Sequence, residues 1–408
     1  MLARLKMKID PPVTEMLDQL PNELWTSEDK TFLDPAMGGG QFVAAIEQRL
    51  RDYGHSDANI AGRVYGFEEN VMRIRYAQRV HGLVGKYSAT NFLEDDVVKK
   101  FDVIVGNPPY QDSGSTSGNK LYTSIIEKSF EILEKDGYLA FITPTGWMSY
   151  ADNKSKRTSF SDGSAYKNIF RDNQIVWLNC RTINSYFPSV GSSFSAYVLK
   201  KSQVSNETSL VTSNNKIEKV RLKNWLFYPK SMNYLSLSIF EKTFFSNKSK
   251  ININQSNEKH ATPFNKSIPA PSREKSTKNK YELFHTNVSS RWSDTKHSCH
   301  DLKKVLLSIS GYIKPIFDNG EKGVTHIGLW IPVTDRSEGE RLIAILQSKL
   351  YQYLIDETHY SGFHLTKVLK MLPAVDLSIS WTDKELYDHF GLTQEERDYI
   401  ESYFAERN

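Results

Sequence analysis

The stretch FLDPAMGGGQF, residues 32–42, decides the fold that we expect for the N-terminal half of the chain. It begins with apolar residues typical of a buried strand, reaches an acidic residue at Asp34, and then runs through three glycines into a helix-like segment. In a doubly wound sheet such a turn lies where ligands bind, and glycines let the backbone approach a ligand closely. The same cluster is also compatible with a tight turn that binds nothing.

Further apolar runs follow before residue 202, and helix-like runs separate some of them. The strand-like runs are RVYGFE, FDVIVGNPPY, GYLAFITP, IVWLNC and SAYVLKK. The alternation of strands with helices predicts an α/β fold with a doubly wound, mostly parallel sheet. The runs are apolar on both faces, as is typical of strands covered by helices on both sides.

The pattern changes near residue 202, and we expect three parts. Residues 1–202 form the sheet domain, residues 203–375 a mixed α+β domain, and residues 376–408 a helical segment. A polar segment rich in Asn, Ser and Lys at 247–280 predicts long loops. One helix is expected at about 338–357.

Sequence signals also predict where three helices begin. Thr382 and Thr393 are each followed three residues later by a glutamate, Glu385 and Glu396. This is the order of a capping box, in which the threonine side chain and the glutamate side chain satisfy each other's backbone donors. Near the N-terminus, Asp10 precedes two prolines and is expected to cap a helix that starts with them.

Composition excludes several classes of protein. The 408 residues contain two cysteines, Cys180 and Cys299, without CxxC or His-rich spacing, so neither a disulfide framework nor a zinc site is expected. The sequence has no apolar run of about 18 residues and no N-terminal signal with a small-residue cleavage site. We therefore expect a cytoplasmic protein without a metal or a membrane partner.

The basic charge is concentrated in one region. Residues 201–300 hold 17 Lys and Arg against 7 Asp and Glu, whereas the rest of the chain holds 35 against 41. The same region contains aromatic side chains, among them Tyr281 and Trp292. Cationic and aromatic side chains together suit the phosphates and bases of a nucleic acid. The alternative is a solvated basic face.

The run VIVGNPPYQDSG, residues 103–114, ends its strand in Asn107, two prolines and Tyr110. Prolines remove backbone donors where the strand leaves the sheet, and they stiffen the turn that carries the asparagine. One strand earlier, GFEEN places Glu68 where a carboxylate can accept hydrogen bonds from both hydroxyls of a ribose. NAD is not expected, because the fingerprint GxGxxG would need glycine where Val43 stands.

In this order, DPAMGGGQF, GFEEN, NF and NPPY resemble the S-adenosylmethionine-dependent DNA adenine-N6 methyltransferases, and the motif order resembles their gamma group. The resemblance implies a Rossmann-like methyltransferase fold, S-adenosyl-L-methionine as cofactor, S-adenosyl-L-homocysteine as product, and double-stranded DNA as partner. It implies that residues 203–375 are a DNA target recognition domain. It also leaves room for a cognate restriction endonuclease in a bacterial or phage-infected cell.

The family's cofactor contacts carry over to eight matching positions. They are Asp34, Ala36, Gly38 and Gly40 for the methionine part, Glu68 for the ribose, Asn91 and Phe92 for the adenine, and Asn107 next to the substrate. The family commonly has aspartate where Asn91 stands. A neutral amide can donate as well as accept, which leaves the direction of the adenine hydrogen bond open.

The resemblance implies a catalytic socket of Asn107, Pro108, Tyr110 and Phe187. The amide oxygen of Asn107 and the carbonyl oxygen of Pro108 would accept hydrogen bonds from an amino group and orient its lone pair toward the sulfonium methyl. Tyr110 and Phe187 would stack on a base flipped out of the duplex. For Phe187 the alternative is a core aromatic at the start of a strand.

Other functions remain open at this point. The socket would recognise a planar amino group, so structured RNA or a protein glutamine is an alternative substrate. A DNA-binding or inhibitory protein with a decayed cofactor domain is a second alternative, although Asp34, Glu68 and Asn107 are intact. A fused nuclease is not expected, because the sequence contains no convincing acidic metal-binding cluster followed by ExK.

Overall fold

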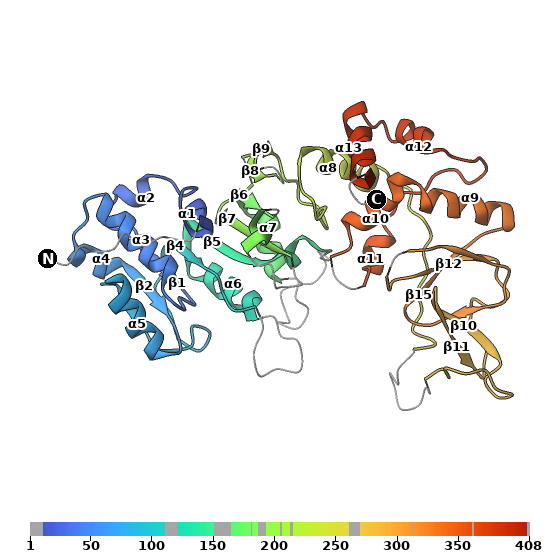
Figure 1. The fold of residues 1–408 in the computed structure, drawn as a ribbon, viewed down its shortest axis with the longest axis horizontal. Helices are drawn as coiled ribbons and strands as arrows, with labels where there is room; N and C mark the ends of the chain where they lie inside the picture. The colour runs from blue at the N-terminus through green and yellow to red at the C-terminus, as the bar shows by residue number, and fades with distance from the viewer. Residues whose placement is uncertain are drawn as a thin grey trace. The chain divides into compact units, whose positions relative to one another are not determined.

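The structure is a computed structural model of the chain. It describes residues 11–110, 121–150, 165–180, 182–186, 193–204, 206–212, 215–260, 270–311, 313–360 and 363–405. The chain divides into two compact units, Met1–Leu226 and Phe227–Asn408. Figure 1 shows the first in blue to green and the second in yellow to red.

The first unit is built on one sheet of nine strands. These are β1 (Phe32–Asp34), β2 (Val64–Phe67), β3 (Lys86–Ser88), β4 (Phe101–Gly106), β5 (Leu133–Pro144), β6 (Gln174–Asn179), β7 (Phe194–Lys200), β8 (Thr208–Val211) and β9 (Ile217–Val220). Their order is β3-β2-β1-β4-β5-β7-β6-β8-β9. All pairs on the β3 side of β5 are parallel, and β7 is antiparallel to both of its neighbours. The expected doubly wound, mostly parallel sheet is confirmed.

The strand order reverses between β1 and β4. The chain runs outward from β1 to β2 and β3, and then returns to lay β4 on the other side of β1. In doubly wound sheets ligands bind at the carboxyl ends of the strands beside such a reversal. Asp34 ends β1 and Asn107 follows β4, so the fold brings two of the predicted site residues to this point.

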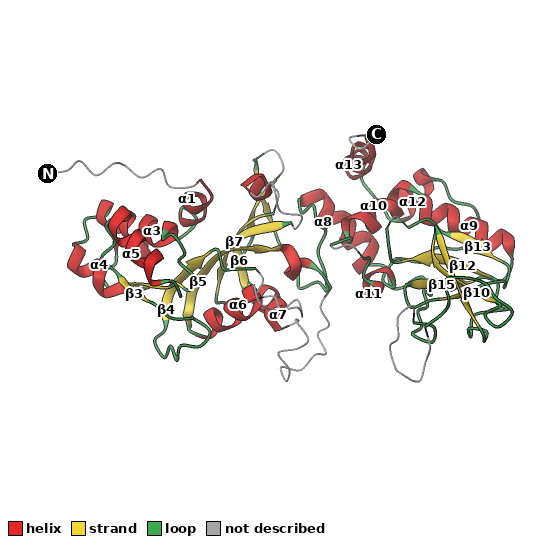
Figure 2. Cartoon of the chain, turned by 60° about the horizontal axis from the view of Figure 1, so that its bottom comes forward, coloured by secondary structure: helices red, strands yellow, loops and turns green. Residues whose placement is uncertain are grey.

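Helices cover both faces of this sheet. They are α1 (Pro11–Leu17), α2 (Glu23–Thr26), α3 (Gln41–Asp52), α4 (Asp57–Arg63), α5 (Val71–His81), α6 (Leu121–Glu131) and α7 (Ala165–Asp172), with short turns η1 (Thr145–Met148) and η2 (Thr182–Tyr186). Figure 2 shows α1, α3 and α5 on one side of the strands and α6 and α7 on the other. α1 begins at Pro11 as expected, while its expected cap, Asp10, lies outside the described residues.

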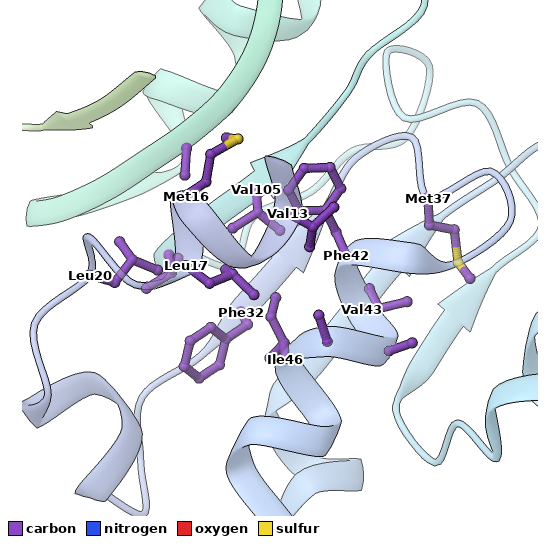
Figure 3. Packing of buried hydrophobic residues seen from close by; sticks show 14 of the residues in the cluster. Val13, Met16, Leu17, Leu20, Phe32, Met37, Phe42, Val43, Ile46 and Val105 are labelled. Carbon is purple, nitrogen blue, oxygen red and sulfur yellow. The ribbon is translucent and has the colours of Figure 1, made fainter. Parts of the chain in front are cut away.

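The core between α1, α3 and the sheet forms the support of the predicted site. Val13, Met16 and Leu17 of α1 lie against Phe42 and Val43 of α3 (Figure 3). All five side chains are at most 6% exposed. The glycine turn is therefore fixed between a buried strand and a buried helix start.

The boundary between the units differs from the one at 202/203 that we expected. β8 pairs with β6 in parallel, and β9 pairs with β8, so both strands extend the sheet of the first unit. The first unit therefore continues to Leu226. Both strands have only four residues, too few to give a clear apolar pattern.

The second unit is a mixed α+β structure. Two three-stranded sheets have the orders β11-β10-β14 and β13-β12-β15. Their strands are β10 (Tyr281–Thr286), β11 (Ser289–Ser293), β12 (Lys304–Ser308), β13 (Ile316–Asp318), β14 (Gly323–Val324) and β15 (Gly328–Pro332). The helices are α8 (Tyr234–Phe240), which continues into η3 (Glu241–Phe245), and α9 (Arg336–Gln347), α10 (Lys349–Glu357), α11 (Thr366–Leu369), α12 (Asp383–His389) and α13 (Gln394–Ala405).

The C-terminal helices belong to this second unit rather than forming a separate segment. Asn233 caps α8 and its side-chain amide donates to the Tyr399 hydroxyl of α13 at 2.8 Å. Lys242 pairs with Glu396 at the start of the same helix at 2.6 Å. The expected part 376–408 is thus packed against residues more than 100 positions earlier in the chain.

Both helix starts that the sequence signals predict in this unit are confirmed. The Thr382–Glu385 and Thr393–Glu396 capping boxes are both formed. The single helix expected at about 338–357 is wrong, because Ser348 ends α9 and caps α10 by accepting a hydrogen bond from the Tyr351 N–H.

Candidate functional site

The glycine turn after β1 is held by the side chain of Asp34. This carboxylate is 1% exposed, and one of its oxygens accepts a hydrogen bond from the Ala36 N–H at 3.0 Å. The Gly40 N–H donates to the Met37 carbonyl at 2.7 Å, which closes the turn before α3 begins. Gly38 has a φ of 52°, and a Cβ there would meet no atom within 4 Å. The turn therefore has open space beside a residue in the left-handed conformation that glycine favours.

The end of β4 approaches this turn closely. A Cβ on Gly106 would lie 2.9 Å from the Asp34 Oδ1, which is closer than real Cβ contacts allow. Glycine at this position lets the two strand ends meet. The next residue, Asn107, is consequently placed beside the buried carboxylate.

These strand ends open into a pocket of about 380 Å³. Its walls come from α1, the glycine turn, the start of α3, the end of β4, β5 and η2. They are Pro11, Pro12, Val13, Asp34, Ala36, Met37, Gly38, Gln41, Phe42, Asn107, Ile142 and Tyr186. Four of the predicted site residues, Asp34, Ala36, Gly38 and Asn107, thus line one pocket.

The buried carboxylate in this pocket is electrostatically unusual. Burial raises the pKa of Asp34 to about 7, the Ala36 N–H opposes that rise, and the negative charge of Glu68 adds to it. In the part of the chain that the structure describes, no cationic side chain forms a salt bridge with Asp34. Perturbed carboxylates of this kind are typical of functional sites.

Glu68 lies beside the pocket without lining it. It follows β2, and its carboxylate accepts a hydrogen bond from the Asn70 N–H at 3.0 Å and lies 3.8 Å from Arg73. Its own N–H donates to the Ser88 carbonyl at 3.1 Å. The preceding residue, Phe67, accepts a hydrogen bond from the Met37 N–H at 2.9 Å, which joins this strand end to the glycine turn.

Asn91 and Phe92 lie on the next loop, also outside the pocket lining. The Asn91 side-chain oxygen accepts a hydrogen bond from the Leu93 N–H at 2.9 Å, so that oxygen is engaged within its own loop. Phe92 is 3% exposed and packs edge-on against Phe67 with 5.4 Å between ring centroids. Phe92 is therefore a core aromatic here, and the strand end that carries Glu68 connects its loop to the pocket.

The NPPY turn is preorganised by a contact between its own first and last residues. The Tyr110 hydroxyl donates to the Asn107 amide oxygen at 2.5 Å. The Tyr110 ring packs against Phe194 with 4.9 Å between centroids, and burial raises the pKa of Tyr110 to about 12. Pro108, which follows Asn107 in the sequence, is buried. Phe187, the expected second aromatic of the socket, lies outside the described residues.

Several pocket residues were not among the predicted site residues. Pro11 and Pro12 reach the pocket from the start of α1, and Tyr186 reaches it from η2 and is 45% exposed. The signals were a pair of prolines after an expected N-cap residue and an aromatic side chain next to Phe187. Only folding brings these segments to the glycine turn, since they lie more than 20 residues away from it in sequence.

The basic region of the second unit forms an ordered surface next to β11. The Ser272 and Trp292 backbones exchange hydrogen bonds of 2.8 Å, which fixes Ser272 beside this strand. Lys275 lies over the Trp292 ring at 5.1 Å and Lys280 over the Tyr281 ring at 5.2 Å. Cationic and aromatic side chains are thus presented together, as nucleic-acid contacts require.

The described residues show neither a metal site nor a membrane span. No group of three or more His, Cys, Asp or Glu side chains among them is placed to hold a metal ion. No helix in that part of the chain is long and apolar enough to cross a membrane.

Part of the first unit is similar to known proteins. Residues 60–175 match the family described as Eco57I restriction-modification methylase. A protein of Mycoplasma pneumoniae described as an uncharacterized adenine-specific methylase is 44% identical over 72 residues, which are 16% of this chain and 16% of that protein. These two matches confirm the resemblance to adenine-specific methylases of restriction-modification systems.

Two solved structures resemble most of the chain weakly. The type IIL restriction-modification enzyme MmeI in complex with DNA has a TM-score of 0.46 at 12% identity, covering 89% of this chain and 64% of that one. The type IIG restriction endonuclease BpuSI has a TM-score of 0.45 at 11% identity, covering 95% and 61%. At such values neither likeness bears on activity.

Proposed function

We propose that the chain is a site-specific DNA methyltransferase that transfers a methyl group from S-adenosylmethionine to N6 of a flipped adenine in double-stranded DNA. The observation that carries this proposal is the pocket in which Asp34 and Asn107 meet at the reversal of strand order. The match of residues 60–175 to a methylase family supports it, because that segment includes Glu68 and the NPPY turn.

The pocket residues fit the cofactor. Gly38 has open space beside it. A turn that binds the methionine part of the cofactor closely needs such space. Asp34 is buried, and among the described residues its one hydrogen-bond donor is the Ala36 N–H, so a cationic group nearby would stabilise its ionised form. Glu68 would accept hydrogen bonds from the ribose. S-adenosylmethionine supplies a methyl group that its positive sulfur has already activated.

The NPPY turn would position the amino group that receives the methyl. The lone pair of adenine N6 is delocalised into the ring, and hydrogen bonds to the Asn107 side-chain oxygen and the Pro108 carbonyl would localise and aim it. In the structure the Tyr110 hydroxyl donates to the same Asn107 oxygen. The incoming amino group would therefore exchange one donor for another rather than meet an acceptor without any hydrogen bond.

The second unit would hold the DNA. Its ordered surface at 270–280 and β11 offers lysines and aromatic rings, which suit phosphates and bases. We propose that this unit contains the target recognition function, with its extent revised to begin at Phe227. Protection of DNA against a cognate restriction endonuclease is the role that the family description suggests.

The direct test is incubation of the full chain with plasmid DNA and S-adenosylmethionine, followed by mapping of N6-methyladenine with single-molecule sequencing. The expected result is complete modification of adenines within one sequence. Asn107→Ala should lower kcat by about 100- to 1000-fold, the scale for losing one preorganised hydrogen-bond partner of a reacting group. Asn107→Asp is the matched variant, because it keeps an acceptor oxygen, and it should retain more activity than Asn107→Ala.

Isothermal titration with S-adenosylmethionine separates binding from chemistry. Asn107→Ala should retain most of the affinity for the cofactor. Comparable turnover in Asn107→Ala and the natural chain would remove NPPY from the catalytic site. Modification of structured RNA or of a protein glutamine, with none of DNA, would instead favour the alternative substrates of the same socket.

A further inference from the structure

A lysine on the helix after the NPPY turn holds the loop that carries Asn91. Lys128 lies in the last turn of α6, and its ammonium donates to three backbone carbonyls of one loop. The distances are 2.6 Å to Phe92, 3.2 Å to Leu93 and 2.5 Å to Asp95. An ammonium has three N–H donors and no acceptor, so this loop uses its full hydrogen-bonding capacity.

The loop is ordered from inside as well. The Glu94 and Asp95 N–H groups both donate to the Asn91 carbonyl, at 3.1 and 3.2 Å, and the Asn91 side chain accepts from Leu93. The result is one tight turn in which the carbonyls of residues 92, 93 and 95 converge on Lys128. Converging carbonyl dipoles repel one another, and a single cation between them offsets that repulsion.

Lys128 also touches the aromatic side chain of this loop. Its ammonium lies 5.0 Å from the centroid of the Phe92 ring, within the range of a cation–π contact. Phe92 in turn packs on Phe67, whose carbonyl accepts the Met37 N–H of the glycine turn. A series of contacts therefore connects Lys128 to Met37, which lines the pocket.

We infer that Lys128 is a positioning residue for the nucleoside end of the cofactor site: its ammonium fixes the backbone of residues 91–95 in the conformation that receives the adenosine of S-adenosylmethionine. This inference rests on the proposed function. Because Lys128 makes its contacts through the loop, it orders the cofactor site before binding, and preorganisation of this kind raises affinity without a direct contact.

The chain contains a matched control for this lysine. Lys201 also donates to two backbone carbonyls, those of Phe130 at 2.7 Å and Leu133 at 2.8 Å, and it lies over the Phe130 ring at 4.9 Å. Neither Phe130 nor Leu133 belongs to the 91–95 loop or lines the pocket. A purely structural lysine of this kind should affect stability and leave the cofactor constants unchanged.

The test compares Lys128→Met with Lys201→Met in the full chain. Lys128→Met should weaken binding of S-adenosylmethionine and of 5′-methylthioadenosine by the same factor, about tenfold, because both contain the adenosine. The KM for the cofactor should rise while kcat at saturating cofactor stays within about twofold. Lys128→Arg should recover part of the affinity, since a guanidinium also offers several donors. Lys201→Met should change neither constant.

Each other outcome counts against the inference. An unchanged KM in a folded Lys128→Met protein, or a loss of kcat at unchanged KM, would overturn it while the proposed function stands. If Lys128→Met does not fold, Lys128→Gln takes its place, because its short neutral side chain cannot span the three carbonyls, and it must show the same rise in KM. Failure of the natural chain to bind S-adenosylmethionine would overturn both proposals.

Discussion

The two units treat a buried carboxylate in opposite ways. In the first unit, Asp34 is 1% exposed at the end of β1, accepts a hydrogen bond from a backbone N–H, and has a pKa raised to about 7. In the second unit, Asp318 is 5% exposed at the end of β13 and faces Lys304 across the strand pair, with 2.6 Å between Nζ and Oδ2. Lys304 is itself fully buried.

This difference separates a carboxylate that is paired within the fold from one that we propose to contact the cofactor. The same oxygen of Asp318, Oδ2, also accepts hydrogen bonds from the Gly320 and Lys322 N–H groups, so the charge of this carboxylate is neutralised by Lys304 and two backbone donors. Within the described part of the chain, Asp34 has neither a paired cation nor a second hydrogen-bond donor. A buried ionised group without a partner is costly, and it persists where function requires it.

The largest effect should come from breaking the paired carboxylate. Lys304→Met leaves Asp318 buried without its cation, and this should lower the free energy of unfolding by about 3 to 5 kcal/mol. Urea denaturation followed by circular dichroism measures the loss. The double variant Lys304→Met with Asp318→Asn keeps an acceptor for the Gly320 N–H and removes the charge, so it should recover much of the stability. Equal stability of the single variant and the natural chain would mean that the pair does not neutralise a buried charge.

The unpaired carboxylate should affect stability through pH instead. With its pKa held at about 7, Asp34 keeps a proton in the folded protein between about pH 4 and 7, where the unfolded chain has lost it. The unfolded state then binds fewer protons, so the free energy of unfolding falls as pH rises through this window. Between pH 5 and 8 the loss due to Asp34 should be about 3 kcal/mol.

Asp34→Asn removes this titration. Urea denaturation at pH 5 and pH 8, without cofactor, should show a smaller pH dependence in Asp34→Asn than in the natural chain. Addition of S-adenosylmethionine should lower the pKa of Asp34 and release protons near pH 7, which titration calorimetry in buffers of different ionisation enthalpy detects. The same pH dependence in both proteins would place the titrating group elsewhere.

The smallest effect should come from the exposed charges of the second unit. Arg273→Glu combined with Lys275→Glu should reduce the slope of log affinity for DNA against log salt by about 2, if each contacts one phosphate. The methylated sequence should stay the same, because phosphate contacts position the protein and base contacts specify the site. Lys384→Glu on α12, also exposed, is the control and should leave the slope unchanged. A changed target sequence would make these residues base-reading rather than phosphate-binding.

The sequence predicted the features whose contacts join residues that are close together in the sequence. The glycine turn, the NPPY turn and the six apolar strands each occupy one short segment with its own pattern. The resemblance placed Asp34 and Asn107 at one site, and the structure brings them together because parallel strands put their carboxyl ends at one edge. Two capping boxes were readable for the same local reason.

Two of the pocket residues that the sequence did not predict depend on contacts between distant segments. Pro11 and Tyr186 line the pocket from opposite ends of the first unit's sequence. The contact of Phe92 with the cofactor stays a prediction; its ring is buried against Phe67, because an aromatic side chain near a strand end can also complete the core. The break at Ser348 was hidden because the apolar spacing of α9 and α10 looks continuous in sequence.

The two small strands at the end of the first unit determine where that unit can be cut. A fragment ending near residue 202 would lack β8 and β9 and would leave the edge of β6 unpaired at Trp177 and Leu178, which are both buried in the full chain. An apolar strand with open backbone groups is a template for pairing with another copy. A fragment ending at Leu226 keeps β9 as the edge, and this strand has only four residues and carries Glu218 and Lys219. We therefore expect the shorter fragment to aggregate and the longer one to remain in solution at the same concentration.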